Sequence, residues 1–362
     1  MGSHVHPATI PWKIITNIWA NIKSRFLQKH LPLVIIKYPI NNSKKAPSTM
    51  KNLLIFTVTL LIPLCSCSQT ENTDTDEPVI PPPSNNYVLQ GSMQGSAELV
   101  EAGYTQIHQY MRKIGWDYSL DHKDGVHGEV IYDLFIRQYI FKLSIHANEK
   151  ALDGDRGKLI DRQRNEMKTQ TTPSWYKLNG NWDEWQQLKW KFKIPKDFRP
   201  SGSFTHLHQL KAQEGNNGSP VITITARSNG NGSNRRIQII HNGDTEETTK
   251  GTIIDNLPLE DFEDEWIQVE TEMHYTHNGS FSITLSRLSD GKRLVQRSFD
   301  DIDLWRKGAI SIRNKFGIYR SFGKTLTDEN DRPTNGIKDE HILLADFKVY
   351  EKNTNPDPQP HD

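Results

Sequence analysis

The chain has 362 residues, of which 35% are hydrophobic, and its 44 Lys and Arg residues balance 44 Asp and Glu residues. A net charge of zero gives no indication of a nucleic-acid partner, which a strongly basic domain would favour. The two cysteines, Cys65 and Cys67, stand together near the N-terminus. The rest of the chain therefore has no disulfide framework, no thiolate metal site and no cysteine nucleophile.

The first part of the chain resembles an export signal. After Met50 and Lys51, the apolar run at residues 53–64 is too short to span a bilayer. It leads into Cys67 through a sequence that is similar to a bacterial lipobox, with an ordinary cleaved signal peptide as the alternative. We expect residues 1–49 to be an upstream extension and residues 50–67 a lipoprotein signal peptide. Lipidation of Cys67 would anchor the exported protein to the cell envelope, at the outer membrane and cell surface.

Two segments have little to bury. Residues 68–86 are rich in Thr, Asp and Pro, and residues 353–362 repeat Asn, Asp and Pro. Such compositions are typical of disordered segments, so we predict a tether before the folded unit and a tail after it. The folded domain is expected at residues 87–352.

Alternation of apolar and polar residues dominates this domain. It is clearest at residues 221–225, 236–240, 266–273, 280–288 and 342–350. Turn residues such as Asn278-Gly279 and Asp290-Gly291 separate the runs, and a helical pattern appears only around residues 96–114. The pattern predicts an all-β fold, an antiparallel two-sheet β-jelly roll.

The first strand of chemical interest spans residues 161–168. Alternate residues of a strand share a face, so Arg162, Arg164, Glu166 and Lys168 are expected on one side. Guanidinium groups match carboxylates in two-point contacts, which favours a groove for an anionic polymer. A solvated face with cross-strand ion pairs is the alternative.

The second strand spans residues 204–212. Here alternation places Gln209 and Lys211 on one face, with His206, His208 and Leu210 on the other. No third ligand has convincing spacing for a metal site, so a packing or surface role is expected for the two histidines.

The third strand spans residues 314–321. Lys315, Gly317 and Tyr319 share a face with Ser321, while Phe316 is expected in the core. A glycine in mid-strand often marks a place where a ligand passes close. Tyr319 is a candidate phenolic acid or base, and an ordinary aromatic on a strand is the alternative.

Together the three strands resemble, in order, the motifs of jelly-roll (concanavalin A-like) polysaccharide lyases of the alginate lyase, heparin lyase I and ulvan lyase kinds. Residues 164–168 are similar to R-S/T-E-L-R, with Lys168 in place of the final Arg. Residues 209–211 are similar to Q-I/V-H, with Lys211 in place of His. Residues 315–321 are similar to the third motif, Y-F-K-A-G-V-Y-N-Q, and keep its Lys, Gly and Tyr.

The resemblance implies β-elimination from a uronic-acid-containing polysaccharide, which leaves unsaturated uronate ends. Such a reaction needs neutralisation of the uronate carboxylate, a base for the C5 proton and an acid for the leaving oxygen. The implied neutralisers are Gln209 and Arg164; Tyr319 is the implied acid, with Tyr319 or Lys211 as the base. Further substrate contacts are implied for Arg162, Glu166, Lys168, Lys315, Arg320 and His208.

Because Lys211 replaces the motif histidine, we expect ulvan or another glucuronate-type polymer, with heparin-like glycans and alginate left open. The alternative function is a non-catalytic glycan-binding surface lipoprotein. A glycosidase is disfavoured because the chain lacks a strand with the paired carboxylates that such enzymes use. We expect a monomer with no cofactor and no nucleic-acid partner, and a structural calcium ion is left open.

Overall fold

The structure, a computed structural model, describes residues 86–120, 127–147, 161–325 and 336–352, all within the compact unit Val79–Asp362. The expected upstream extension, the signal peptide with Cys67, the tether up to residue 85 and the C-terminal tail lie outside the described residues. None of the described helices is long and apolar enough to cross a bilayer.

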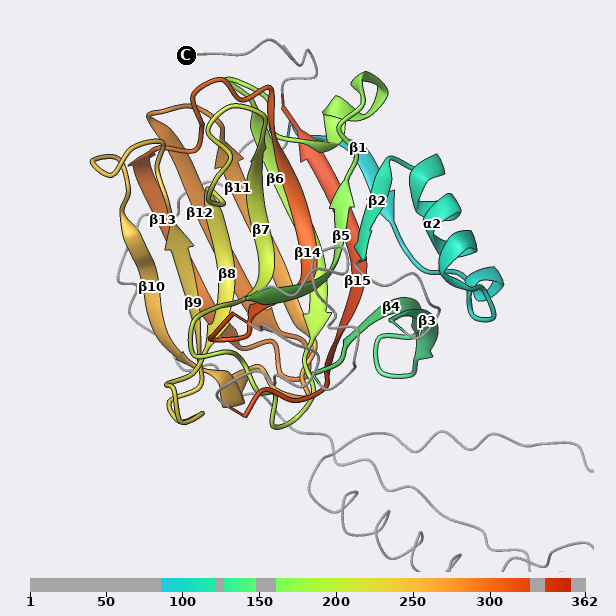
Figure 1. The fold of residues 1–362 in the computed structure, drawn as a ribbon. Coiled ribbons are helices and arrows are strands. Elements are labelled where there is room, and N and C mark those ends of the chain that lie inside the picture. Colours follow the sequence, from blue (N-terminus) through green and yellow to red (C-terminus); the bar gives the residue numbers. More distant parts are fainter. Residues whose placement is uncertain (1–85, 121–126, 148–160, 326–335, 353–362) are drawn as a thin grey trace, which may run out of the picture. The chain divides into compact units, whose positions relative to one another are not determined.

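The described strands form two antiparallel sheets that lie one behind the other (Figure 1). The sheet nearer the viewer, called the front sheet here, contains in order β10 (Gly251–Pro258), β9 (Arg236–His241), β8 (Ile222–Arg227), β7 (Thr205–Gln213), β14 (Ser311–Ser321), β5 (Arg162–Thr169) and β2 (Trp116–Leu120). The back sheet contains in order β13 (Arg293–Ile302), β12 (Gly279–Arg287), β11 (Ile267–His274), β6 (Trp185–Lys193), β15 (Glu340–Glu351), β4 (Gln138–Ile145) and β3 (Gly128–Asp133), with β1 (Val88–Met93) also paired to β15. This arrangement confirms the predicted all-β jelly roll.

Within the described residues, helical structure is confined to short segments. Helix α2 (Tyr104–Lys113) packs beside β2, within the region where the sequence indicated a helix (Figure 1). The remaining helical segments are 3₁₀ turns at Ala97–Leu99, Pro173–Leu178 and Leu259–Asp261.

The core lies between the sheets and is rich in aromatic side chains. Along β6 buried and partly exposed residues alternate without a break, and from Gln187 onward the buried residues are apolar and the partly exposed ones polar. Trp190 of β6 packs against Phe316 of β14, with ring centroids 5.0 Å apart, and Trp116 of β2 packs against Phe347 of β15 at 5.2 Å. Each such buried side chain contributes roughly 1.5–3 kcal/mol to stability, so these contacts hold the two sheets together.

A bulge interrupts the pairing of β14 with β7. Phe316 pairs with His208 and Tyr319 pairs with His206, so that Gly317 and Ile318 together oppose Leu207. A bulge shifts the alternation of side chains along a strand. Against β8, Leu207 is the extra residue, because His206 pairs with Thr225 and His208 pairs with the adjacent Ile224. The alternation of β7 therefore shifts at Leu207, so that Leu207 and His208 are both buried on the core side and His206 lies on the outer face.

Candidate active site

Tyr319, on β14, lies on the outer face of the front sheet among cationic side chains. Its strand neighbours in the pairing are Arg164 on β5 and His206 on β7. The phenol oxygen accepts a hydrogen bond from Nη1 of Arg162 at 3.1 Å. The guanidinium carbon of Arg164 and Nζ of Lys315 lie 5.9 and 5.7 Å from the centroid of the tyrosine ring. These charges stabilise negative charge on the phenol oxygen or on an anion bound beside it.

Arg162 is held in position by two neighbours. Its Nε and Nη2 both donate to the carboxylate of Asp161 at 2.6 Å, and its guanidinium carbon lies 5.8 Å from the ring centroid of Phe204. The hydrogen bonds to Asp161 raise the pKa of Arg162 above its usual value. Phe204 also packs against Tyr319, with centroids 5.3 Å apart. Arg162 therefore stays charged and points one donor at the phenol.

A buried network lies beside this pair. Glu166 accepts hydrogen bonds from Gln209 at one carboxylate oxygen and from Lys315 at the other. Burial alone would raise the pKa of Glu166, but the charge of Lys315 and the two hydrogen bonds hold the pKa below its usual value. All three side chains are buried, so the carboxylate fixes the ammonium group and the amide. Gln209 keeps its second amide hydrogen for another acceptor.

His206 is a site residue that the simple alternation placed on the wrong face. The expectation that it shares the face of His208 is wrong, because the bulge puts it opposite Tyr319. Its Nδ1 lies 2.8 Å from Oγ1 of Thr225, and its ring stacks on Phe204 with centroids 4.7 Å apart. Burial and nearby cations lower its pKa to about 3. His206 is thus a neutral imidazole beside a phenol.

Lys211 takes a different position from the one that its motif implied. It shares the outer face with Gln209 but pairs with Arg313, whereas His206 pairs with Tyr319. Its Nζ donates to the backbone oxygens of Asn217 and Gly218, the latter at 2.9 Å. Burial and neighbouring cations lower its pKa to about 8. The structure therefore does not support the role of Lys211 as the base that acts with Tyr319.

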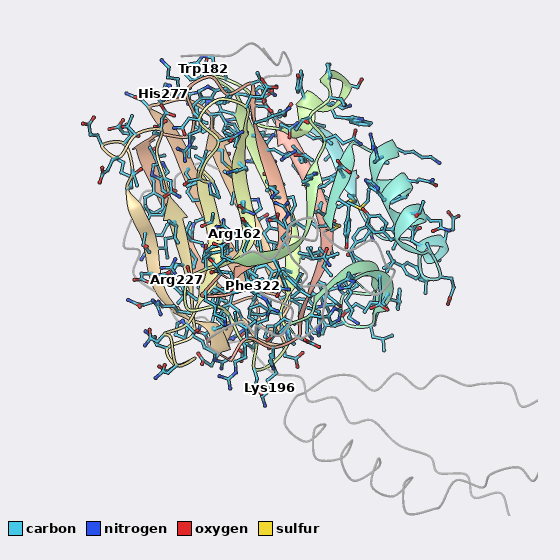
Figure 2. All side chains as sticks on the ribbon, viewed as in Figure 1. Arg162, Trp182, Lys196, Arg227, His277 and Phe322 are labelled. Carbon is cyan, nitrogen blue, oxygen red and sulfur yellow. The ribbon has the colours of Figure 1, made fainter. Side chains whose placement is uncertain are left out.

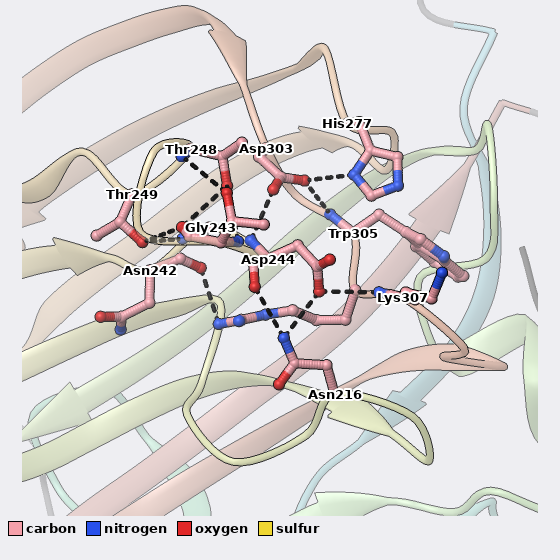
Figure 3. A network of polar contacts seen from close by, with 12 residues as sticks. Asn216, Asn242, Gly243, Asp244, Thr248, Thr249, His277, Asp303, Trp305 and Lys307 are labelled. Atoms are coloured by element: carbon pink, nitrogen blue, oxygen red, sulfur yellow. Dashed lines mark hydrogen bonds and ion pairs between the residues drawn. The ribbon is translucent and has the colours of Figure 1, made fainter. Parts of the chain in front are cut away.

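The turn that receives Lys211 is itself fixed by two carboxylates, Asp244 and the buried Asp303 (Figure 3). Asp244 accepts hydrogen bonds from Nδ2 of Asn216 and from the backbone N–H of Lys307, both at 2.9 Å. Asp303 accepts one from the backbone N–H of Asp244 at 2.7 Å and lies 2.9 Å from Nδ1 of His277. These contacts tie the turn after β7 to the segment before β14.

Two of the expected substrate contacts point into the protein. His208 is 2% exposed and packs between Trp190 and Phe316, with centroids 5.4 and 4.8 Å away. Arg320 is fully buried and donates to Oε1 of Gln163 and to the backbone oxygen of Lys338, both at 2.7 Å. The expectation that His208 and Arg320 contact a polymer is therefore wrong: both face the space between the sheets.

Lys168 and Arg313 extend the cationic surface. Lys168 pairs with Lys315 across the strands, and its Nζ is 3.8 Å from Asp117. Burial and the charge of Arg313 lower its pKa to about 8, which the charge of Asp117 opposes. Arg313, two residues before Lys315, lies outside the sequence motif and was not predicted. In the part of the chain that the structure describes, no three His, Cys, Asp or Glu residues are grouped as metal ligands.

The comparisons with known proteins give structural similarity only. No family model matches the chain, and no curated protein matches its sequence. An endo-β-1,4-glucuronan lyase from the fungus Trichoderma reesei is 14% identical, with a TM-score of 0.47 over 76% of this chain and 100% of that one. An alginate lyase from Pseudomonas aeruginosa is 12% identical, with a TM-score of 0.38 over 65% of this chain and 97% of that one. An alginate lyase from Aplysia kurodai is 11% identical, with a TM-score of 0.37 over 62% and 86% of the two chains.

These solved structures belong to the kind of enzyme that the three sequence motifs resemble. At these identities the similarity is one of fold.

Proposed function

We propose that this protein is a polysaccharide lyase that cleaves an anionic, uronic-acid-containing polymer by β-elimination. The observation that carries the proposal is the arrangement around Tyr319: a phenol that accepts a hydrogen bond from Arg162, with Arg164 and His206 on the two neighbouring strands. His206 as a neutral proton acceptor, Tyr319 as a proton donor and Arg164 as an anion binder therefore lie side by side on three neighbouring strands.

The chemistry assigns a role to each group. Arg164, with the remaining amide hydrogen of Gln209, binds the uronate carboxylate and stabilises the enolate-like intermediate formed when the C5 proton leaves. His206 accepts that proton, and Tyr319 gives its phenol proton to the leaving glycosidic oxygen as the C4–O bond breaks and the C4–C5 double bond forms. The bound carboxylate adds negative charge near His206. This negative charge offsets the effect of the nearby cations, which lower the pKa of His206.

Cationic side chains favour a polymer with regular negative charge. We propose a glucuronate-type polymer, with ulvan as the first substrate to test, because Lys211 stands where the alginate lyase motif has histidine. Heparin-like glycans and alginate complete the panel.

The test is the ultraviolet absorbance of the unsaturated uronate product, followed on this panel with wild type and Tyr319→Phe. The substitution removes one oxygen and keeps the ring, so turnover is expected to fall by about 10²–10⁴. The free energy of unfolding should change by only about 1 kcal/mol, the value of one hydrogen bond. Wild-type turnover in Tyr319→Phe would exclude the mechanism. A wild type that binds polymer without forming the chromophore would instead identify a glycan-binding protein.

A further inference from the structure

Two arginines lie directly opposite each other on adjacent strands, β8 and β9, at some distance from Tyr319. Arg227, the last residue of β8, pairs directly with Arg236, the first residue of β9. Like charges in directly opposite positions of neighbouring strands destabilise a sheet. Burial, and then the charge of Arg236, lower the pKa of Arg227 below its usual value.

The protein's own acidic groups balance this pair incompletely. Asp255 on β10 lies 3.6 Å from Nε of Arg236, but the same carboxylate also accepts hydrogen bonds from Gln238 at 2.8 Å and from the backbone of Asn256 at 2.7 Å. Nε of Arg227 is buried and has no hydrogen-bond partner among the described residues. Two guanidinium groups thus share one carboxylate, and a buried donor is unpaired.

The pair lies on the same outer face as the candidate active site. Thr225, two residues before Arg227, pairs with His206 and carries the hydroxyl that contacts the imidazole. The charge of Arg227 is among those that lower the pKa of His206. Strand β8 is two strands from β14, or about 10 Å across the sheet. Figure 2 labels both Arg227 and Arg162, with Arg227 displaced toward the side of the molecule where β9 lies in Figure 1.

We infer that Arg227 and Arg236 form an anion subsite that binds the carboxylate or sulfate group of a sugar unit beyond the one being cleaved. Guanidinium groups bind such oxyanions in two-point contacts, and one bound anion would relieve the repulsion within the pair. The inference rests on the proposed function and extends it to the substrate class: a polymer with negative charge on more than one unit within reach of the front sheet.

The experiment compares Arg227→Gln and Arg236→Gln with wild type on long polymer and on the shortest oligosaccharide that is cleaved. On the long polymer KM is expected to rise roughly tenfold, as for the loss of one charge-assisted contact, with kcat within about twofold. On the shortest substrate the difference should disappear. Arg297→Gln, at an exposed arginine of β13 on the back sheet, is the matched control and should leave both parameters unchanged.

Desulfated polymer distinguishes the two anions. If the rise in KM persists after desulfation, the subsite binds a carboxylate; if it vanishes, the subsite binds a sulfate. Unchanged KM for both variants on every polymer overturns the subsite while Tyr319→Phe still tests the lyase. If wild type proves inactive, titration calorimetry with polyglucuronate and with sulfated ulvan oligosaccharides replaces kinetics, and equal affinity of wild type and Arg227→Gln overturns the subsite.

Discussion

His206 and Tyr319 face one another across two paired strands, and their surroundings suit them to opposite steps of a proton transfer. The imidazole contacts a threonine hydroxyl and has a pKa lowered to about 3, so it is unprotonated at neutral pH. The phenol accepts a hydrogen bond from the charged Arg162. Lys211, which the motif resemblance offered beside Tyr319 as the base, donates hydrogen bonds to two backbone carbonyls.

This difference between His206 and Lys211 gives a first prediction. His206→Gln should lower kcat by about 10²–10⁴, because the proton acceptor is lost, whereas Lys211→Met should lower it less than about tenfold. Initial rates of chromophore formation measure both. A larger fall in kcat for Lys211→Met than for His206→Gln would show that Lys211 is the base.

The pH profile offers a second check on the same residue. Since the pKa of His206 is lowered to about 3, its protonation should not reduce kcat/KM between pH 7 and pH 5. The lowered pKa would be contradicted if kcat/KM of the wild type fell with an apparent pKa near the ordinary histidine value. The residual kcat/KM of His206→Gln should then show no such fall.

The placement of single residues could be predicted only where strands are regular. Strand β5 pairs with β14 without a shift, so Arg162, Arg164 and Lys168 share the face that their alternation predicted. On β7 alternation failed at His206, because a bulge depends on two strands together and is not written in either one alone. Gly317 was the available signal, since glycine in mid-strand indicates a bulge as well as a ligand.

At the scale of the element, Gly317 is one of the two β14 residues that oppose Leu207 at the bulge. Its φ of +145° is a conformation that favours glycine. A Cβ at this position would collide with the backbone oxygen of Asn165 on β5. Backbone atoms of β5 fill the space beside Gly317, so packing within the sheet requires a glycine here. The sequence interpretation, that a ligand passes close to this glycine, is not needed to explain the residue.

The prediction for this element concerns stability. Gly317→Ala should lower the free energy of unfolding by about 1–3 kcal/mol through backbone strain alone. The clash with Asn165 should lower it further. Gly218→Ala is the control, because a Cβ at Gly218 would meet no atom within 4 Å and its φ is not in the left-handed region; it should change stability by less than about 0.5 kcal/mol. Urea unfolding measures both, and equal values for the two variants would show that the bulge tolerates a side chain.

At the scale of the whole molecule, the sequence predicted the class of fold but not the order of its strands. Alternation identified β11 and β12, whose burial alternates as expected. It did not predict that β6 lies between β11 and β15, because that pairing depends on contacts between residues far apart in the chain. The same limit applies to the site, whose β5, β7 and β14 become neighbours only in the folded sheet.

Anchoring of the molecule is a prediction from the sequence alone. Protein expressed from Met50 in a bacterial host that processes lipoproteins should incorporate labelled fatty acid and partition into detergent, because Cys67 follows a lipobox-like sequence. Cys67→Ala should abolish both properties, and Cys65→Ala should retain them. Unlabelled, detergent-excluded wild type would show that the signal is an ordinary cleaved peptide.

The stability of the whole domain should also depend on a pair of buried carboxyl groups away from the site. Glu184, just before β6, accepts two hydrogen bonds from Asn181, at 3.0 and 2.8 Å. Glu351, at the end of β15, accepts one from Gln186 at 3.3 Å. The other oxygen of each carboxyl has no such donor, and the two side chains contact one another. Burial raises the pKa of both groups, and the charge of Glu184 raises that of Glu351 further. We therefore predict that one proton is shared between the two carboxyl groups, which would satisfy the remaining oxygens.

Because these pKa values are raised in the folded state, the folded protein binds more protons than the unfolded chain above the ordinary carboxyl pKa. The stability that the shared proton provides is therefore complete in mild acid and is lost as the pH rises through the raised pKa values.

Glu351→Gln keeps a neutral side chain of similar shape, so its free energy of unfolding should fall less between pH 5 and pH 9, by on the order of 1–3 kcal/mol relative to wild type. Urea unfolding at both pH values measures the difference. Glu270→Gln, at an ion pair with Lys189 on the back sheet, is the control and should follow wild type. Parallel curves for wild type and Glu351→Gln would mean that no proton is shared between Glu184 and Glu351.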